Sequence, residues 1–334
     1  MIRVALRPKA AHPSQPKTPL TPRQRLLRVA SWLGWPLWVW LSFMGAGLLC
    51  SAVLYLLFHG QESVPVLPLI MMQTAVYVVA LALLIGLPWL VWRARPKMPA
   101  SFRTTWRQLG WRRSLQWRDF GWALVGFIVY IVLSMIALAA AKQWLPGFDA
   151  TQAQNLGYQQ LYGAERLLAF AMLVVVAPVA EELVFRGYLY SKLHAAHMPV
   201  WLITVVVSGL FGYVHGQLNV GIDVAMLSIV LVALRHTTGT IWPGILIHMV
   251  KNTMHFWRCL SLWWGREERA AWRTQPRDFI LCRYLFSRIN PRTPLSWHLS
   301  TGAGAHRTRK YLEASDQIYG KALPFYLAGT FSVW

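Results

Sequence analysis

Three short groups of polar residues lie inside apolar segments and could do chemistry together. The first group is Glu181, Glu182 and Arg186, within the run APVAEELVFRGYLY at 177–190. A charged group in hydrocarbon costs roughly 2.5–3.5 kcal/mol on insertion scales, so a segment that keeps three of them is expected to use them. These residues are therefore candidates either for catalysis or for a structural polar cluster between helices.

Helical spacing separates these three side chains into a pair and a single carboxyl group. Glu182 and Arg186 are four residues apart, so they lie on one helix face and can form an ion pair that offsets the cost of burial. Glu181 is rotated by about 100° from Glu182 and lacks that partner. An unpaired carboxyl group in an apolar setting can act as a general base near neutral pH.

The second and third groups supply histidine and amide side chains. His215 ends an apolar segment in the run FGYVH, and His248 and Asn252 are four residues apart in a later one. Imidazole and amide groups can donate hydrogen bonds to a developing oxyanion, which together with a glutamate base is typical of a hydrolase. A single histidine at a helix end more often has a structural role, so this interpretation requires the three segments to meet.

Composition places these segments in a membrane. The chain has 334 residues, of which 56% are hydrophobic and 13% charged. Although the net charge is +21, the basic residues form short blocks between apolar runs, where they set topology and contact anionic lipid headgroups. We therefore expect membrane lipids and no nucleic acid as partners. The three cysteines are widely separated, which predicts neither a metal site nor a disulfide framework.

The apolar runs predict an all-α fold, a polytopic transmembrane helix bundle of about seven spans with a catalytic cavity between the helices. Long runs can cross the roughly 30 Å hydrocarbon core. Lys and Arg concentrate in alternate loops, which predicts a cytoplasmic N terminus. An eighth helix is the alternative, because seven spans would place the basic C-terminal tail outside. The predicted spans are about 31–58, 64–92, 120–141, 167–190, 199–215, 220–234 and 240–257.

The predicted organisation has five parts. Residues 1–30 are basic and proline-containing, which is typical of a disordered tail, and 31–92 form a transmembrane hairpin. Residues 93–118 combine basic and Trp side chains, as in a segment at the membrane interface, although a solvated loop is an alternative. Residues 119–257 form the catalytic membrane core. Residues 258–334 form a basic tail of doubtful structure, without a sustained period or a spanning run.

The order of the three motifs resembles a known family. EExxxR at 181–186, FxxxH at 211–215 and HxxxN at 248–252, each in its own apolar segment, are similar to the CPBP family. This is the CAAX protease and bacteriocin-processing (Abi) group of intramembrane glutamic endopeptidases, related to the type II CAAX prenyl endopeptidase. The resemblance covers roughly residues 103–257 and does not extend to the C-terminal tail.

The resemblance implies roles for individual residues. Glu181 would activate a water for attack on a peptide carbonyl, and His215 would help to orient the water or share its proton. His248 and Asn252 would stabilise the oxyanion. The reaction would then proceed without a covalent acyl intermediate.

The resemblance also implies a structural pair and a substrate class, and the composition suggests a location. Glu182 and Arg186 would hold the helix register around the site. The substrate would be a peptide or protein, with a lipid-modified CAAX-type or a bacteriocin-related peptide as the two candidates. A basic membrane protein of this length fits a bacterial inner membrane.

Two alternatives remain at the level of sequence. Glu181, His215 and His248 form a ligand set that catalytic zinc accepts, although the HExxH pair of the usual zinc endopeptidase is missing, so we expect no cofactor. A transporter or a non-catalytic immunity protein could also use intramembrane Glu, His and Arg side chains. A Glu181→Gln substitution discriminates, because it should abolish cleavage only in a protease.

Overall fold

The computed structural model describes residues 21–59, 64–95, 104–150, 152, 161 and 163–264. Every regular element in these residues is a helix, which confirms the all-α prediction. Residues 1–20 of the predicted N-terminal tail and residues 265–334 of the predicted C-terminal tail lie outside the described residues.

The described elements join into seven continuous helical segments. Five of them are long and apolar enough to cross a membrane, and α8 is a shorter apolar helix of 14 residues, so the chain is a polytopic helix bundle. In chain order the elements are α1 (Pro22–Phe58), α2 (Val66–Leu81), η1 (Ala82–Gly86), α3 (Leu87–Ala94), α4 (Trp117–Trp144), α5 (Gly163–Ala171), η4 (Met172–Val176), α6 (Ala177–Glu182), η5 (Leu183–Leu189), α7 (Tyr190–Ala195), α8 (Val200–Tyr213), α9 (Leu218–Thr238) and α10 (Trp242–Trp264).

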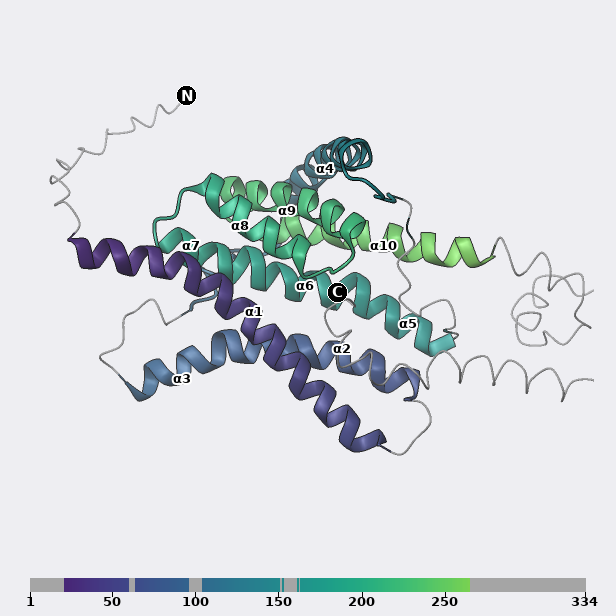
Figure 1. The fold of residues 1–334 in the computed structure, drawn as a ribbon, viewed down its shortest axis with the longest axis horizontal. Helices are drawn as coiled ribbons and strands as arrows, with labels where there is room; N and C mark the ends of the chain where they lie inside the picture. Colours follow the sequence, from purple (N-terminus) through teal and green to yellow (C-terminus); the bar gives the residue numbers. More distant parts are fainter. Residues whose placement is uncertain are drawn as a thin grey trace, which may run out of the picture.

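The segment from α5 to α7, which carries the motif at 177–190, runs through the middle of the bundle (Figure 1). The N-terminal hairpin of α1, α2 and α3 packs on one side of it, and α8, α9 and α10 pack on the other. The helix α4 lies at the outer edge against α9 and α10. The central segment is therefore enclosed by helices from both ends of the described chain.

The first helix begins earlier than the sequence pattern predicts. The Thr21 backbone N–H donates to Gln24 Oε1 at 3.0 Å, and the Gln24 backbone N–H donates to Thr21 Oγ1 at 3.3 Å. This reciprocal capping box, followed by Pro22 at the first helical position, starts a helix at once. The predicted boundary at residue 30 is therefore too late, because local capping extends α1 into the basic region.

A wide π-helical turn lets the central segment pass a proline. Pro178 has no N–H to donate and its ring crowds the carbonyl four residues earlier, which would kink or break a regular helix. In η4 the chain widens instead, and the Ala177 N–H donates to the Met172 carbonyl, five residues back. The turn η1 precedes Pro88 in the same way. The helix therefore continues through the proline to Glu181.

The described part of the basic linker, residues 104–116, folds against the ends of the core helices. Arg235 of α9 donates to the Gln108 carbonyl at 3.1 Å and to the Arg186 carbonyl at 3.0 Å. Trp242 Nε1 donates to the Arg113 carbonyl at 2.9 Å. Two points of the linker backbone are therefore bonded to the core helices, through the buried Arg235 and the half-buried Trp242, while most of its side chains are exposed.

The helices α8 and α9 cross at two glycines. A Cβ added to Gly212 would lie 2.6 Å from the Gly221 carbonyl oxygen, and one added to Gly221 would lie 2.8 Å from the Gly212 carbonyl oxygen. Small residues of this kind let helix backbones approach closely in a membrane. The crossing fixes the turn between α8 and α9, which carries His215.

We expect Gly212→Ala to lower the free energy of unfolding by about 1–3 kcal/mol, the usual cost of overpacking, because the methyl group would meet backbone. Thermal unfolding in detergent would measure the change. Gly209→Ala is the matched control in the same helix, since a Cβ there meets nothing within 4 Å. Equal stability of the two variants would contradict a tight crossing.

Candidate active site

The pair Glu182 and Arg186 forms as the four-residue spacing predicts. Arg186 Nη1 lies 2.8 Å from Glu182 Oε1, and both side chains are fully buried. The guanidinium also lies over the Phe211 ring of α8, with its Cζ 4.5 Å from the ring centroid. The pair thus connects the central segment to the next helix in the core.

Glu181 has a partner that sequence reasoning did not identify. The hydroxyl of Tyr77, on α2, donates to Glu181 Oε1 at 2.5 Å. The other carboxylate oxygen, Oε2, lies 3.5 Å from His248 Nε2 and has no hydrogen-bond partner among the described residues. Glu181 therefore has one oxygen that accepts a hydrogen bond and a second, buried oxygen that accepts none from the described residues.

His248 lies between the two glutamates. Its Nε2 is 3.5 Å from Glu181 Oε2, and its Nδ1 is 3.5 Å from Glu182 Oε1. Gly244, one turn earlier on α10, allows this approach, because a Cβ there would lie 2.7 Å from Glu182 Oε2. The imidazole is almost completely buried and contacts both carboxylates of the motif.

His215 lies just after α8 and is oriented by the backbone of that helix. Its Nδ1 lies 2.7 Å from the carbonyl oxygen of Phe211, which is in the last turn of α8. A carbonyl oxygen can only accept, so Nδ1 carries the hydrogen, and in the neutral ring Nε2 is left as an acceptor. The ring packs edge-on against the Phe211 ring, with centroids 4.9 Å apart. Nε2 can therefore take a proton or bind a water.

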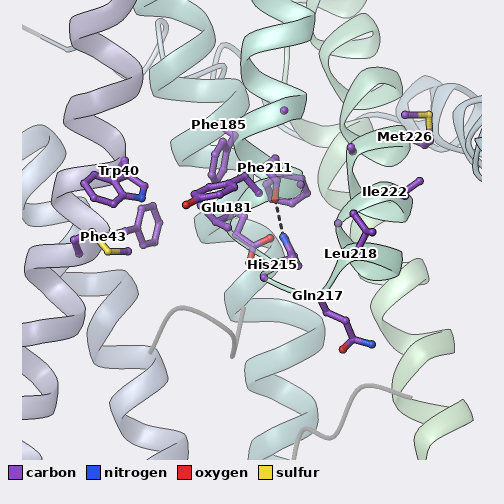
Figure 2. A pocket seen from close by; sticks show the side chains of 18 residues that line it. Trp40, Phe43, Glu181, Phe185, Phe211, His215, Gln217, Leu218, Ile222 and Met226 are labelled. Carbon is purple, nitrogen blue, oxygen red and sulfur yellow. Dashed lines mark hydrogen bonds between the residues drawn. The ribbon is translucent and has the colours of Figure 1, made fainter. Parts of the chain in front are cut away.

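A cavity of about 570 Å³ brings Glu181 and His215 together (Figure 2). Figure 2 shows both side chains turned toward the same part of it, between α1 and the α8–α9 pair. The volume lies in the range of small-molecule and substrate sites. Its side-chain walls include the aromatic residues Trp40, Phe43, Phe185 and Phe211 and the aliphatic residues Leu218, Ile222 and Met226. His248 and Asn252 are not among its lining residues.

Asn252 bonds to the backbone of the central segment. Its Nδ2 donates to the Leu173 carbonyl at 2.9 Å. In a regular helix that carbonyl would accept from the Ala177 N–H, which instead bonds to Met172 across the π turn. Asn252 thus satisfies a carbonyl freed by the wide turn. This contact ties α10 to the wide turn of the central segment.

The three motif segments therefore meet, but through contacts that the sequence did not specify. Phe211, which the motif names without a role, lies against Arg186, His215 and His248. Tyr77 and the α1 residues of the cavity wall were missed, because tyrosines and tryptophans are frequent throughout the apolar runs. The only signal for Tyr77 is a hydroxyl in the interior of a predicted span.

The zinc alternative requires Glu181, His215 and His248 to converge on one point. Within the described residues, no group of three or more His, Cys, Asp or Glu side chains is arranged to hold a metal ion. Metal independence of the reaction stays a prediction.

Comparison with known families adds to this geometry. Residues 163–254 match the family model described as "Type II CAAX prenyl endopeptidase Rce1-like". These matched residues are called the Rce1-like domain below, after the family that they resemble. The domain holds all three motifs, from the start of α5 to just beyond Asn252 on α10. No curated protein and no solved structure matched the chain.

The match to the Rce1-like family agrees with the resemblance that the order of the motifs suggested. This family consists of membrane proteases. Together with the five long apolar helices, it identifies an integral membrane protein. The hairpin of α1 and α2 lies outside the matched residues. The hairpin nevertheless supplies Tyr77 to Glu181 and part of the cavity wall, so it is not separate from the predicted catalytic core.

Proposed function

We propose that this chain is an intramembrane endopeptidase in which Glu181 activates a water to hydrolyse a peptide bond. The observation that carries the proposal is the shared cavity, into which Glu181 and His215 both project. Glu181 also keeps one carboxylate oxygen without a hydrogen-bond partner among the described residues. The match of residues 163–254 to an endopeptidase family supports the same reaction.

The reaction conserves protons without any further reagent. Glu181 takes a proton from water as the oxygen attacks the peptide carbonyl carbon, and His215 Nε2 orients that water or shares the proton. The remaining N–H of Asn252 and the His248 imidazole stabilise the negative oxygen of the tetrahedral intermediate. The proton on Glu181 then passes to the leaving nitrogen as the C–N bond breaks.

The remaining residues of the motif hold this arrangement in place. The buried pair of Glu182 and Arg186 fixes the register of the central segment next to the base. His248 contacts both glutamates, so the register of the pair also determines where the imidazole lies. These contacts support our proposal that the pair has a structural role, as the CPBP resemblance implies.

The proposed substrate is a peptide or protein segment that enters from the membrane. A largely apolar cavity wall suits a hydrophobic or lipid-modified segment, such as a CAAX-type C terminus, or a bacteriocin-related peptide. Membrane lipids would surround the exposed apolar faces of α1 and α4. We propose a bacterial inner membrane with the N terminus in the cytoplasm, in line with the loop charges.

Comparison of membrane proteomes tests this proposal. New peptide termini should accumulate in cells that produce the native chain and be absent from cells that produce Glu181→Gln at the same level. Identical sets of termini in the two cultures would refute the protease assignment. The sequences around the shared cleavage sites would define the substrate class.

We expect cleavage by the purified protein to survive chelation, because the proposed mechanism draws both the base and the oxyanion donors from side chains. The measurement is the cleavage rate before and after treatment with a strong chelator and dialysis, with a zinc endopeptidase treated in parallel as a control. Complete loss of cleavage, restored by Zn²⁺, would instead support the zinc alternative.

A further inference from the structure

A tyrosine hydroxyl reaches the candidate base from a helix outside the Rce1-like domain. Tyr77 lies on α2 and is 4% exposed. Its ring packs edge-on against Phe43 of α1, with centroids 6.3 Å apart, and Phe43 stacks on Phe185 of the central segment at 6.4 Å. Packing between three helices therefore holds the hydroxyl 2.5 Å from Glu181 Oε1.

The direction of this hydrogen bond determines what it does. An ionised carboxylate has only acceptors, so the Tyr77 hydroxyl donates and Glu181 Oε1 accepts. This leaves Oε2, which is buried 3.5 Å from His248 Nε2 and accepts no hydrogen bond from the described residues, as the oxygen that we expect to take a proton from water. Tyr77 is not among the residues that line the cavity. Because its hydroxyl donates to Glu181, we expect any influence of Tyr77 on a substrate to pass through that carboxylate.

The geometry of the carboxyl group makes such a contact useful. The last torsion of a glutamate side chain is broad, so an unrestrained carboxylate samples many orientations. A charge-assisted hydrogen bond to one oxygen is short and about twice as strong as a neutral one, and it selects one orientation. A general base must lie within hydrogen-bond reach of the proton it removes, and a misplacement of about 1 Å can cost roughly 100-fold in rate.

We propose that Tyr77 is a positioning residue that fixes the Glu181 carboxylate for proton transfer, so that α2 belongs to the active site. The inference rests on the proposed function of Glu181 as a base. It extends that function to a helix that neither the motifs nor the family match contains.

The first test compares Tyr77→Phe with the native chain on a quenched-fluorescent peptide that carries a cleavage site from the proteome comparison. We expect kcat to fall by about 10-fold to 100-fold, the size expected for losing one hydrogen bond to a charged group. KM should stay within about twofold, because Tyr77 acts through the base and not through substrate binding. A purely structural defect would not separate the two constants in this way.

Tyr130→Phe is the matched control. Tyr130, on α4, is also a buried tyrosine whose hydroxyl donates to a carboxylate, Asp223 Oδ1, at 2.9 Å. The same chemical change is made there at a carboxylate outside the cavity wall. Its kcat should remain within about twofold of native, even if both variants lose similar stability.

A second variant keeps the proposal testable if Tyr77→Phe folds poorly. Fluorotyrosine at position 77 retains the ring and the hydroxyl donor, so it should restore kcat to within about threefold of native, where phenylalanine does not. If both replacements give the same kcat, the hydroxyl has no role and the inference is wrong.

The Glu181→Gln variant, assayed in parallel, separates the two proposals. If Glu181→Gln is inactive and Tyr77→Phe keeps native kcat, only the role of Tyr77 is refuted. If Glu181→Gln cleaves at the native rate, both proposals are overturned.

Discussion

Replacing Glu181 with Gln is expected to lower the rate of peptide cleavage by about 10²-fold to 10⁴-fold, the usual contribution of a positioned general base. Glutamine has nearly the same shape, and its carbonyl oxygen can still accept the Tyr77 hydroxyl, which donates to Glu181 in the native protein. The amide cannot take a proton from water at neutral pH. The fold should therefore persist while the chemical step fails.

The measurement is the initial cleavage rate of purified protein in detergent micelles, with membrane insertion and thermal unfolding recorded for the same preparation. Glu165→Gln is the matched control, because Glu165 lies at the start of the same helical segment. It should cleave at the native rate. Retention of full cleavage by Glu181→Gln with an unchanged fold would rule out the proposed base.

Arg186→Met is expected to have the largest effect on stability, with a loss of about 3–5 kcal/mol in the free energy of unfolding. The reason is that Glu182 is fully buried and bonded to Arg186 at 2.8 Å, so removal of the cation leaves an uncompensated carboxylate in the core. The substitution also removes the contact between the guanidinium and the Phe211 ring. We expect a lower yield of folded protein and a lower midpoint of thermal unfolding.

The double variant Glu182→Leu with Arg186→Met should recover most of this loss, since a buried ion pair can often be replaced by apolar side chains of similar volume. Arg118→Met, on the exposed surface of α4, is the control for removal of a single arginine. If the double variant is less stable than Arg186→Met alone, the pair does not account for the effect. In a separate measurement, the cleavage rate of the double variant relative to the native chain would show how far the ion pair positions the catalytic residues.

Much of the fold was predictable because apolar runs of spanning length leave the backbone few options other than helix. The four-residue spacing of Glu182 and Arg186 likewise determined their ion pair, which the structure contains. Helix ends were less predictable, since they depend on local capping. At Pro22 a capping box overrides the basic composition that suggested a tail.

The site was predictable only in part, because its remaining contacts join residues that are distant in the chain. The hydrogen bond from Tyr77 to Glu181 links positions on two helices, and nothing near Tyr77 in sequence distinguishes it from other aromatic residues. The bond from Asn252 to the Leu173 carbonyl exists because a π turn frees that carbonyl. The motif names Asn252 but carries no information about that backbone partner.

The wide turn at η4 sets the rotational phase between the two halves of the central helix. A π turn holds one more residue than the regular turn it replaces, and each residue of an α-helix advances the chain by about 100°. Deleting a single residue from 172–176 would thus rotate Arg166 and the rest of α5 by about a quarter turn relative to Glu181. The number of residues in this turn therefore determines which face of α5 packs against α2 and α10 while Glu181, on α6, faces the cavity.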